Sequence, residues 1–112
     1  MAADRIRGHL RTLVLAAIAA RETVHGYGLI ADLKARSKGQ LSLNEGAVYP
    51  ALHQLEADGL ITSAVDDSSG RKRRSYELTD AGRAVLVEEA ADWVEFRDAV
   101  DSILEEITWL KF

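Results

Sequence analysis

The stretch NEGAVYPALHQLEADGLI, residues 44–61, decides the fold of this chain. Its first part carries one apolar helix face, formed by Val48, Leu52 and Leu55. This helical pattern stops at Gly59, and a strand-like run over residues 60–65 starts at once. A helix that passes directly into a β-ribbon predicts a winged helix-turn-helix.

A second strand-like run follows, and a basic turn joins it to the first. Residues 66–70 read DDSSG, a turn-forming sequence, and residues 73–78 are expected to form the second strand. Four consecutive cations stand at this junction: Arg71, Lys72, Arg73 and Arg74. Such a tip suits duplex DNA, because it can neutralise phosphates while the preceding helix enters the major groove. Strand alternation sends odd- and even-numbered cations to opposite sides, so we expect only part of the cluster to face DNA.

Two helices are expected ahead of this region, as a scaffold for the third. Apolar residues recur at helical spacing over residues 5–21, which favours an uncleaved amphipathic helix over a secretory signal. A break over residues 23–27 precedes a second helix over residues 27–36. The third helix starts with either Ser42, in a Ser-x-x-Glu capping box, or Asn44 as its N-cap.

The face of the third helix opposite its apolar stripe is expected to be exposed. Helical spacing places Gly46, Pro50, His53 and Gln54 outward, with Ala47 and Tyr49 on the flanks. Pro50 removes a backbone hydrogen bond inside the helix, so we expect a distorted first part.

Seven residues of the helix and hairpin are candidates for DNA contact: Asn44, Ala47, Tyr49, His53, Arg71, Lys72 and Arg73. An asparagine at a helix start can pair bidentately with adenine, or it can serve as the cap. The hydroxyl of Tyr49 can reach a phosphate or a base edge, although its ring can equally pack between helices.

A long final helix is expected from an N-cap at Thr79 to near the C-terminus. Two apolar series repeat along it every seven residues: Leu86, Trp93, Val100 and Ile107, then Phe96, Ile103 and Leu110. A seam this wide needs a partner surface, and we expect the same helix of a second copy, with residues 5–21 adding area. We therefore predict dimer contacts at Leu86, Val100, Ile103 and Ile107. Burial against its own domain is the alternative.

Composition describes an ordinary globular chain with an uneven distribution of charge. Its 112 residues are 47% hydrophobic, contain no cysteine and carry a net charge of −4. Residues 1–76 carry 11 Lys and Arg against 8 Asp and Glu, whereas residues 77–112 carry 3 against 10. This division predicts a basic reading surface and an acidic element held away from DNA. Acidic helix faces that only keep the protein soluble are an equal alternative.

The sequence offers no case for an enzyme, a metal site or a cofactor. His9, His25 and His53 are too scattered for a metal motif, and no phosphate loop or nucleophile elbow is present. The absence of cysteine excludes disulfides and thiolate sites, and it fits a reducing cytoplasm. No apolar run is long enough to span a membrane.

With these residues in hand, the chain resembles the PadR family of bacterial winged-helix transcriptional regulators, in the short form with one C-terminal helix. Four stretches carry the resemblance: HGYGL (residues 25–29), GAVYPALHQLEADGLI (46–61), GRKRRSYELTDAG (70–82), and the terminal helix with Trp93 and Phe96. The resemblance implies a mainly α fold with a two-stranded wing. Residues 1–78 would bind DNA, and residues 79–112 would form the dimerisation helix.

The resemblance also implies how the protein would act. It implies a bacterial, cytoplasmic homodimer whose third helices enter successive major grooves of an operator, usually to repress detoxification, efflux or stress genes. In some members the dimer interface holds a flat aromatic effector, and Trp93 with Phe96 is the corresponding pair here. Interface packing alone is the other reading of Trp93. A winged-helix interaction module or small-molecule carrier without DNA binding is the alternative function.

Overall fold

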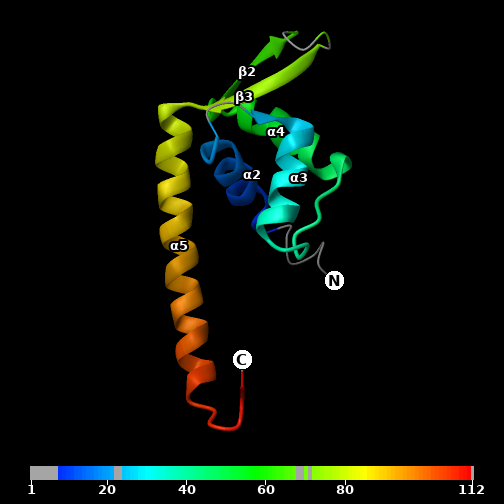
Figure 1. Cartoon of the computed structure of the whole chain (residues 1–112). Helices are drawn as coiled ribbons and strands as arrows, with labels where there is room; N and C mark the ends of the chain where they lie inside the picture. The colour runs from blue at the N-terminus through cyan, green and yellow to red at the C-terminus, as the bar shows by residue number, and fades with distance from the viewer. Residues whose placement is uncertain (1–7, 22–23, 68–69, 71, 112) are drawn as a thin grey trace.

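The computed structural model describes residues 8–21, 24–67, 70 and 72–111. The described elements are, in chain order, α2 (Leu10–Ala19), β1 (Val24–His25), α3 (Gly26–Arg36), α4 (Glu45–Ala57), β2 (Ile61–Asp66), β3 (Arg73–Leu78) and α5 (Asp80–Glu105). Three helices and a small sheet form one domain, and α5 runs down its side and far beyond it (Figure 1). This arrangement confirms the predicted winged helix-turn-helix with a long C-terminal helix.

The core lies where α2, α3, α4 and the base of the sheet meet. Its largest fully buried side chains are Val14, Leu15, Ile18, Leu29, Val48, Leu52 and Ile61. Burying a side chain of this size stabilises a fold by about 1.5–3 kcal/mol. Since α2 is central to this packing, it fixes the angle between the other helices and the sheet.

Two boundaries near the N-terminus differ from the expected ones. The helix expected over residues 5–21 is α2, which begins only at Leu10, while Gly8 and His9 form a turn and residues 5–7 lie outside the described residues. Glycine inside a helix costs about 1 kcal/mol relative to alanine, which favours a boundary there. The break expected over residues 23–27 contains β1 and the first residues of α3.

The sheet has three described strands, not the two expected. Its order is β1-β3-β2, with both pairs antiparallel, Val24 opposite Tyr76 and Ile61 opposite Leu78. β1 spans only two residues, which is too short for an alternating pattern to be recognised in the sequence. Its pairing with β3 ties the inner part of the wing to the start of α3.

The N-cap of α4 is Asn44. Its side-chain oxygen accepts a hydrogen bond of 2.9 Å from the backbone N–H of Ala47, so this alternative holds over Ser42. The helix continues unbroken through Pro50, so the expected distortion does not interrupt it. The missing N–H belongs to the bond with the carbonyl of Gly46, in the exposed first turn, where water can replace the absent donor.

The last helix starts as predicted but ends early. Thr79 is its N-cap and accepts a 3.0 Å hydrogen bond from the N–H of Gly82. The helix ends at Glu105, so Ile107 and Leu110, predicted to continue its seam, lie beyond it. Acidic residues at a helix C-terminus oppose the helix dipole, and no basic residue lies in the last turn. No helix among the described residues is long and apolar enough to cross a membrane.

A close backbone contact joins α5 to the corner between α4 and β2. The hydroxyl of Thr79 donates to the carbonyl of Gly59 at 2.7 Å, and its N–H donates to the carbonyl of Leu60 at 3.0 Å. Gly82 is buried against the same corner, where an added Cβ would overlap with the carbonyl oxygen of Leu60. Only glycine fits at this position without moving one backbone against the other.

We predict that Gly82→Ala strongly destabilises the fold. Because the clash is with backbone and cannot be relieved by a side-chain rotation, we expect the free energy of unfolding to fall by about 3 kcal/mol. Gly28→Ala is the matched control, since its added Cβ meets nothing within 4 Å on the exposed start of α3. That variant should gain roughly 0.5–1 kcal/mol. Urea unfolding at equal protein concentration compares the two, and equal midpoints would contradict the prediction.

Candidate nucleic-acid interface

The outer face of α4 is small, polar and exposed. Gly46, Pro50, His53 and Gln54 are exposed and Ala47 is half-buried, which confirms the predicted orientation of the helix. Gln54 donates to Asp58 at 3.0 Å, one turn further along the helix. Asn44 uses its oxygen for the cap, so its amide nitrogen keeps both hydrogens for another acceptor. The first turns of α4 can therefore approach another surface closely.

Tyr49 lies on a flank of α4 and packs against the start of α3. A Cβ added at Gly26 would stand 2.9 Å from the ring and 3.0 Å from the hydroxyl oxygen of Tyr49. The side chain is half-buried and belongs to the margin of the core. Of the two roles expected for Tyr49, packing between helices is the one with a visible contact. Gly26 makes room for it.

The wing carries its cations on both faces, as strand alternation predicts. Tyr76 is buried toward the domain, so Arg74 lies on the same face of β3 and Arg73 on the opposite face. Lys72, Arg73 and Arg74 are all exposed. Arg71 lies outside the described residues. The cations therefore gather at the free end of the hairpin but do not all point one way.

Arg74 is linked to α4 through Ser63. Its Nη1 donates to the Ser63 hydroxyl oxygen at 3.0 Å, and that hydroxyl donates to the carboxylate of Glu56 at 2.8 Å. Burial raises the pKa of Tyr76 nearby; Tyr49 and Glu56 add to the rise, and Arg74 opposes it. Neither Glu56 nor Ser63 was predicted as a site residue. Each is a single polar residue without a motif, so only the folded geometry reveals the link.

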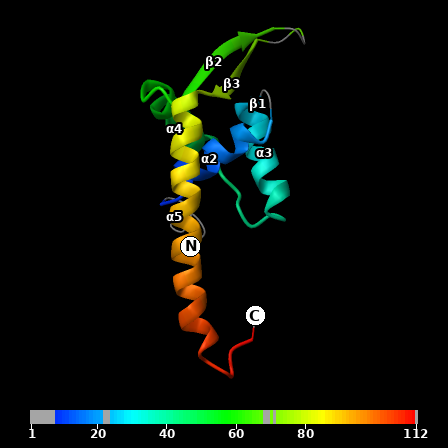
Figure 2. The same ribbon diagram turned by 90° about the vertical axis from the view of Figure 1, so that its left-hand side faces the viewer.

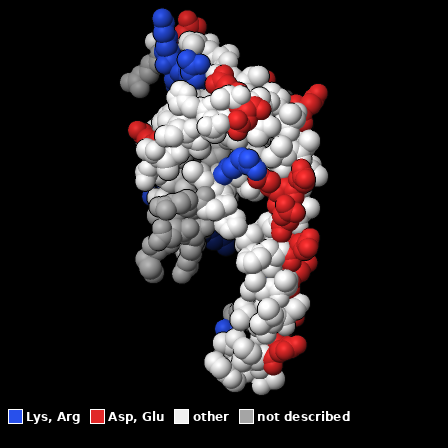
Figure 3. All heavy atoms as spheres, turned by 180° about the vertical axis from the view of Figure 1, so that it is seen from behind, with Lys and Arg blue, Asp and Glu red and all other residues white. Residues whose placement is uncertain are grey.

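Charge is separated across the molecule. Viewed from behind, Lys and Arg side chains stand at the end of the wing with a few acidic ones beside them, and a nearly continuous row of Asp and Glu follows the outer edge of α5 (Figure 3). The acidic residues of α5 and its flanks are Asp80, Glu88, Glu89, Asp92, Glu95, Asp98, Asp101, Glu105 and Glu106. A polyanion is therefore attracted to the wing end and repelled by the helix.

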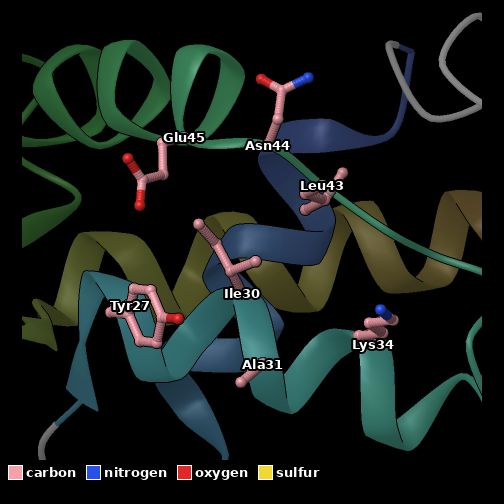
Figure 4. Close-up of a pocket in the computed structure, with 7 residues that line it drawn as sticks. All are labelled: Tyr27, Ile30, Ala31, Lys34, Leu43, Asn44 and Glu45. Carbon is pink, nitrogen blue, oxygen red and sulfur yellow. The ribbon is translucent and has the colours of Figure 1, made fainter.

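A groove runs beside the start of α4 (Figure 4). Tyr27, Ile30, Ala31 and Lys34 come from α3, Leu43 and Asn44 from the segment that leads into α4, and Glu45 from the first turn of α4; together they line a volume of about 420 Å³. Its walls are mostly apolar, with one cation and one carboxylate at the rim. This groove has no signature in the sequence, because its two sides come from separate segments with no shared pattern.

Two polar contacts hold the upper half of α5 against α2. Arg11 donates to one carboxylate oxygen of Glu89 from Nε at 2.9 Å and from Nη2 at 2.7 Å. Thr12 donates to the other oxygen at 3.1 Å. The hydrogen bond to Glu89 raises the pKa of Arg11 above its already high usual value. In the sequence Arg11 resembles a free surface cation, whereas in the fold it forms a contact between two helices.

The lower half of α5 stands clear of the domain in both ribbon views (Figure 2). Leu86 packs against the core, but three seam residues further along are exposed: Phe96 at 61%, Val100 at 36% and Ile103 at 67%. Trp93 is 45% exposed; its ring meets His9 edge-on at 5.3 Å and Phe96 at 6.2 Å. Ile107, beyond the helix, is half-buried.

Several known proteins are similar to this chain in both sequence and fold. Residues 14–88 match the model of the transcriptional regulator PadR-like family. The transcriptional regulator Rv3488 of Mycobacterium tuberculosis is 39% identical over 80% of this chain and 74% of its own.

Solved structures of PadR family regulators have a similar fold. A PadR family regulator from Eggerthella lenta is 33% identical, with a TM-score of 0.77 over 91% of this chain and 87% of its own. A PadR-like regulator from Bacillus cereus is 29% identical, with a TM-score of 0.78 over 90% and 96%. The chain belongs to the PadR-like family of transcriptional regulators, which are DNA-binding proteins and not enzymes.

Proposed function

We propose that this protein is a cytoplasmic homodimer that binds an operator with two half-sites and represses transcription until a small aromatic or amphipathic effector releases it. The exposed face of α4 beside a basic wing is the observation that carries DNA recognition. Asn44, Ala47 and His53 would meet the major groove, and Tyr49 would support the helix from its flank. Arg71, Lys72 and Arg73 would contact phosphates.

Dimerisation is supported by the uncovered apolar face of α5. Leu86 and Glu89 face α2, and the same helix face continues below as Phe96, Val100 and Ile103. A row of exposed apolar residues on a projecting helix is unfavourable in water, so a partner would cover it. A second copy offers the same face in a two-fold arrangement. Leu86 and Ile107 would lie at the edges of that interface.

The effector would bind where Trp93 of α5, with Phe96 next to it, meets His9 just ahead of α2. Trp93 and Phe96 present rings that can stack on a flat ligand. A ligand there would favour one packing of the two helices, and that packing sets the distance between the two α4 helices. Only a spacing near roughly 34 Å fits half-sites one turn apart, so the ligand would shift the population away from the DNA-binding form. The repressor role rests on the resemblance to other PadR members.

The alternative function is a winged-helix interaction module or small-molecule carrier without DNA binding. A protein of this kind could use the same aromatic seam of α5, but the cations of its wing would have no role. Salt-dependent binding to duplex DNA separates the two functions.

Fluorescence anisotropy tests DNA recognition directly. We expect tight, salt-sensitive binding to a duplex from the gene's own upstream region, and weaker binding to random duplex. Replacing Arg71, Lys72 and Arg73 with Ala should weaken both and flatten the dependence of log K on log salt, by roughly 0.9 for each phosphate that is no longer neutralised. Equal replacement of Arg36, Arg97 and Lys111, all remote from the wing end, is the charge-matched control. If both triple variants show the wild-type slope, the wing does not contact phosphates.

Paired substitutions in α5 test the dimer. Val100→Glu with Ile103→Glu should yield monomers, because like charges would face each other in a dry seam. The control places the same charges on the outer face of α5, as Ala91→Glu with Ser102→Glu, and should remain dimeric. Sedimentation velocity gives the mass, and circular dichroism checks that both variants are folded. A dimer of the seam variant at wild-type strength would rule out this interface.

A further inference from the structure

The contact between the wing and α4 is a chain of two hydrogen bonds that joins three elements. Arg74 on β3 donates to Ser63 on β2, and Ser63 donates to Glu56 on α4, at 3.0 and 2.8 Å. The serine hydroxyl commits its only proton to the carboxylate, so its lone pair is directed at the guanidinium. Hydrogen bonds in such a chain polarise and strengthen each other.

Arg74 is therefore turned back toward α4, unlike a cation that extends freely from the hairpin tip. It lies on the same face of the sheet as Ser63 and Tyr76, the face that packs on the domain. The bond to Ser63 uses one of the five N–H donors of the guanidinium, and the side chain is exposed. A fixed guanidinium with unused donors is suited to a phosphate, which accepts two parallel N–H bonds.

We propose that Glu56, through Ser63, is a positioning residue that holds Arg74 as a preformed ligand for one phosphodiester group of the DNA strand that passes between α4 and the wing. The inference rests on the proposed DNA binding and adds a specific phosphate contact with its support. Because Ser63 stands between the two charges, the carboxylate orients the guanidinium without a direct ion pair that a phosphate would have to break. Ordering Arg74 before DNA arrives reduces the entropy cost of binding.

Substitutions of Arg74 test the phosphate contact by the salt dependence of DNA binding. Arg74→Ala should weaken operator and random duplex alike and lower the slope of log K against log salt by about 0.9. Arg74→Lys keeps the charge and should restore the slope, but not the full affinity, because lysine cannot form the two parallel bonds. Arg97→Ala removes the same charge from lower α5 and should leave the slope unchanged.

Substitutions of Ser63 and Glu56 test the positioning without changing any cation. Ser63→Ala should lower affinity by roughly three- to tenfold at an unchanged slope, since Arg74 remains charged but is no longer ordered. Ser63→Thr keeps the hydroxyl in a strand-compatible side chain and should restore the affinity. Glu56→Gln keeps an acceptor for Ser63 and should bind within about twofold of wild type, whereas Glu56→Ala should resemble Ser63→Ala. Thermal unfolding of each variant checks that the fold keeps its wild-type stability.

The outcomes separate the two levels of the proposal. Salt-dependent binding by wild type with the same slope for Arg74→Ala and Arg97→Ala would overturn the phosphate contact and leave DNA recognition standing. A reduced slope for Arg74→Ala, with Ser63→Ala binding like wild type, would overturn the positioning by Glu56. No salt-dependent binding by wild type would overturn the proposed function itself.

Discussion

The structure depends on the contact between the start of α5 and the carbonyl of Leu60. Thr79 binds this corner twice through hydrogen bonds, and Gly82 allows the helix backbone to approach without an intervening side chain. The corner ends α4 and begins β2, so one contact fixes three elements. If the helix were held only by apolar side chains, it could slide or rotate by small amounts at little cost. A backbone contact permits far fewer arrangements, which ties the orientation of α5 to that of α4.

The charged side chains of this protein fall into two groups. In the first group, cations stand at the end of the wing and acidic side chains line the outer edge of α5, an arrangement that would favour a polyanion at the wing (Figure 3). Other charges are structural. Arg11 is committed to Glu89 between two helices, and Arg21 and Arg36 both pair with Asp32. A net charge therefore says little about what this protein binds, because several of its cations are already paired within the fold.

The sequence predicted the elements that have strong periodicity or an unambiguous cap. The buried stripe of α4, the bounds of β3 and the Thr79 cap were all confirmed, since each depends on local chemistry that spacing alone reveals. The features it missed are of two kinds. β1 exists only because β3 offers a partner, so two residues without a pattern become a strand. The link from Glu56 to Arg74 joins three segments through single polar atoms, and no spacing rule encodes it.

The length of α5 relates movements at its far end to rotations of the domain. Its 26 residues span roughly 39 Å at about 1.5 Å per residue; Thr79 holds its start at the corner, and Glu89 holds its upper half against α2. A displacement of about 3 Å at the far end corresponds to a rotation of only about 4° about the start of a helix this long. A large change of packing near the far end would therefore turn the winged-helix domain by only a few degrees, if helix and domain moved as one rigid body. Conversely, a rotation of that domain by about 4° would carry the far end of the helix through about 3 Å.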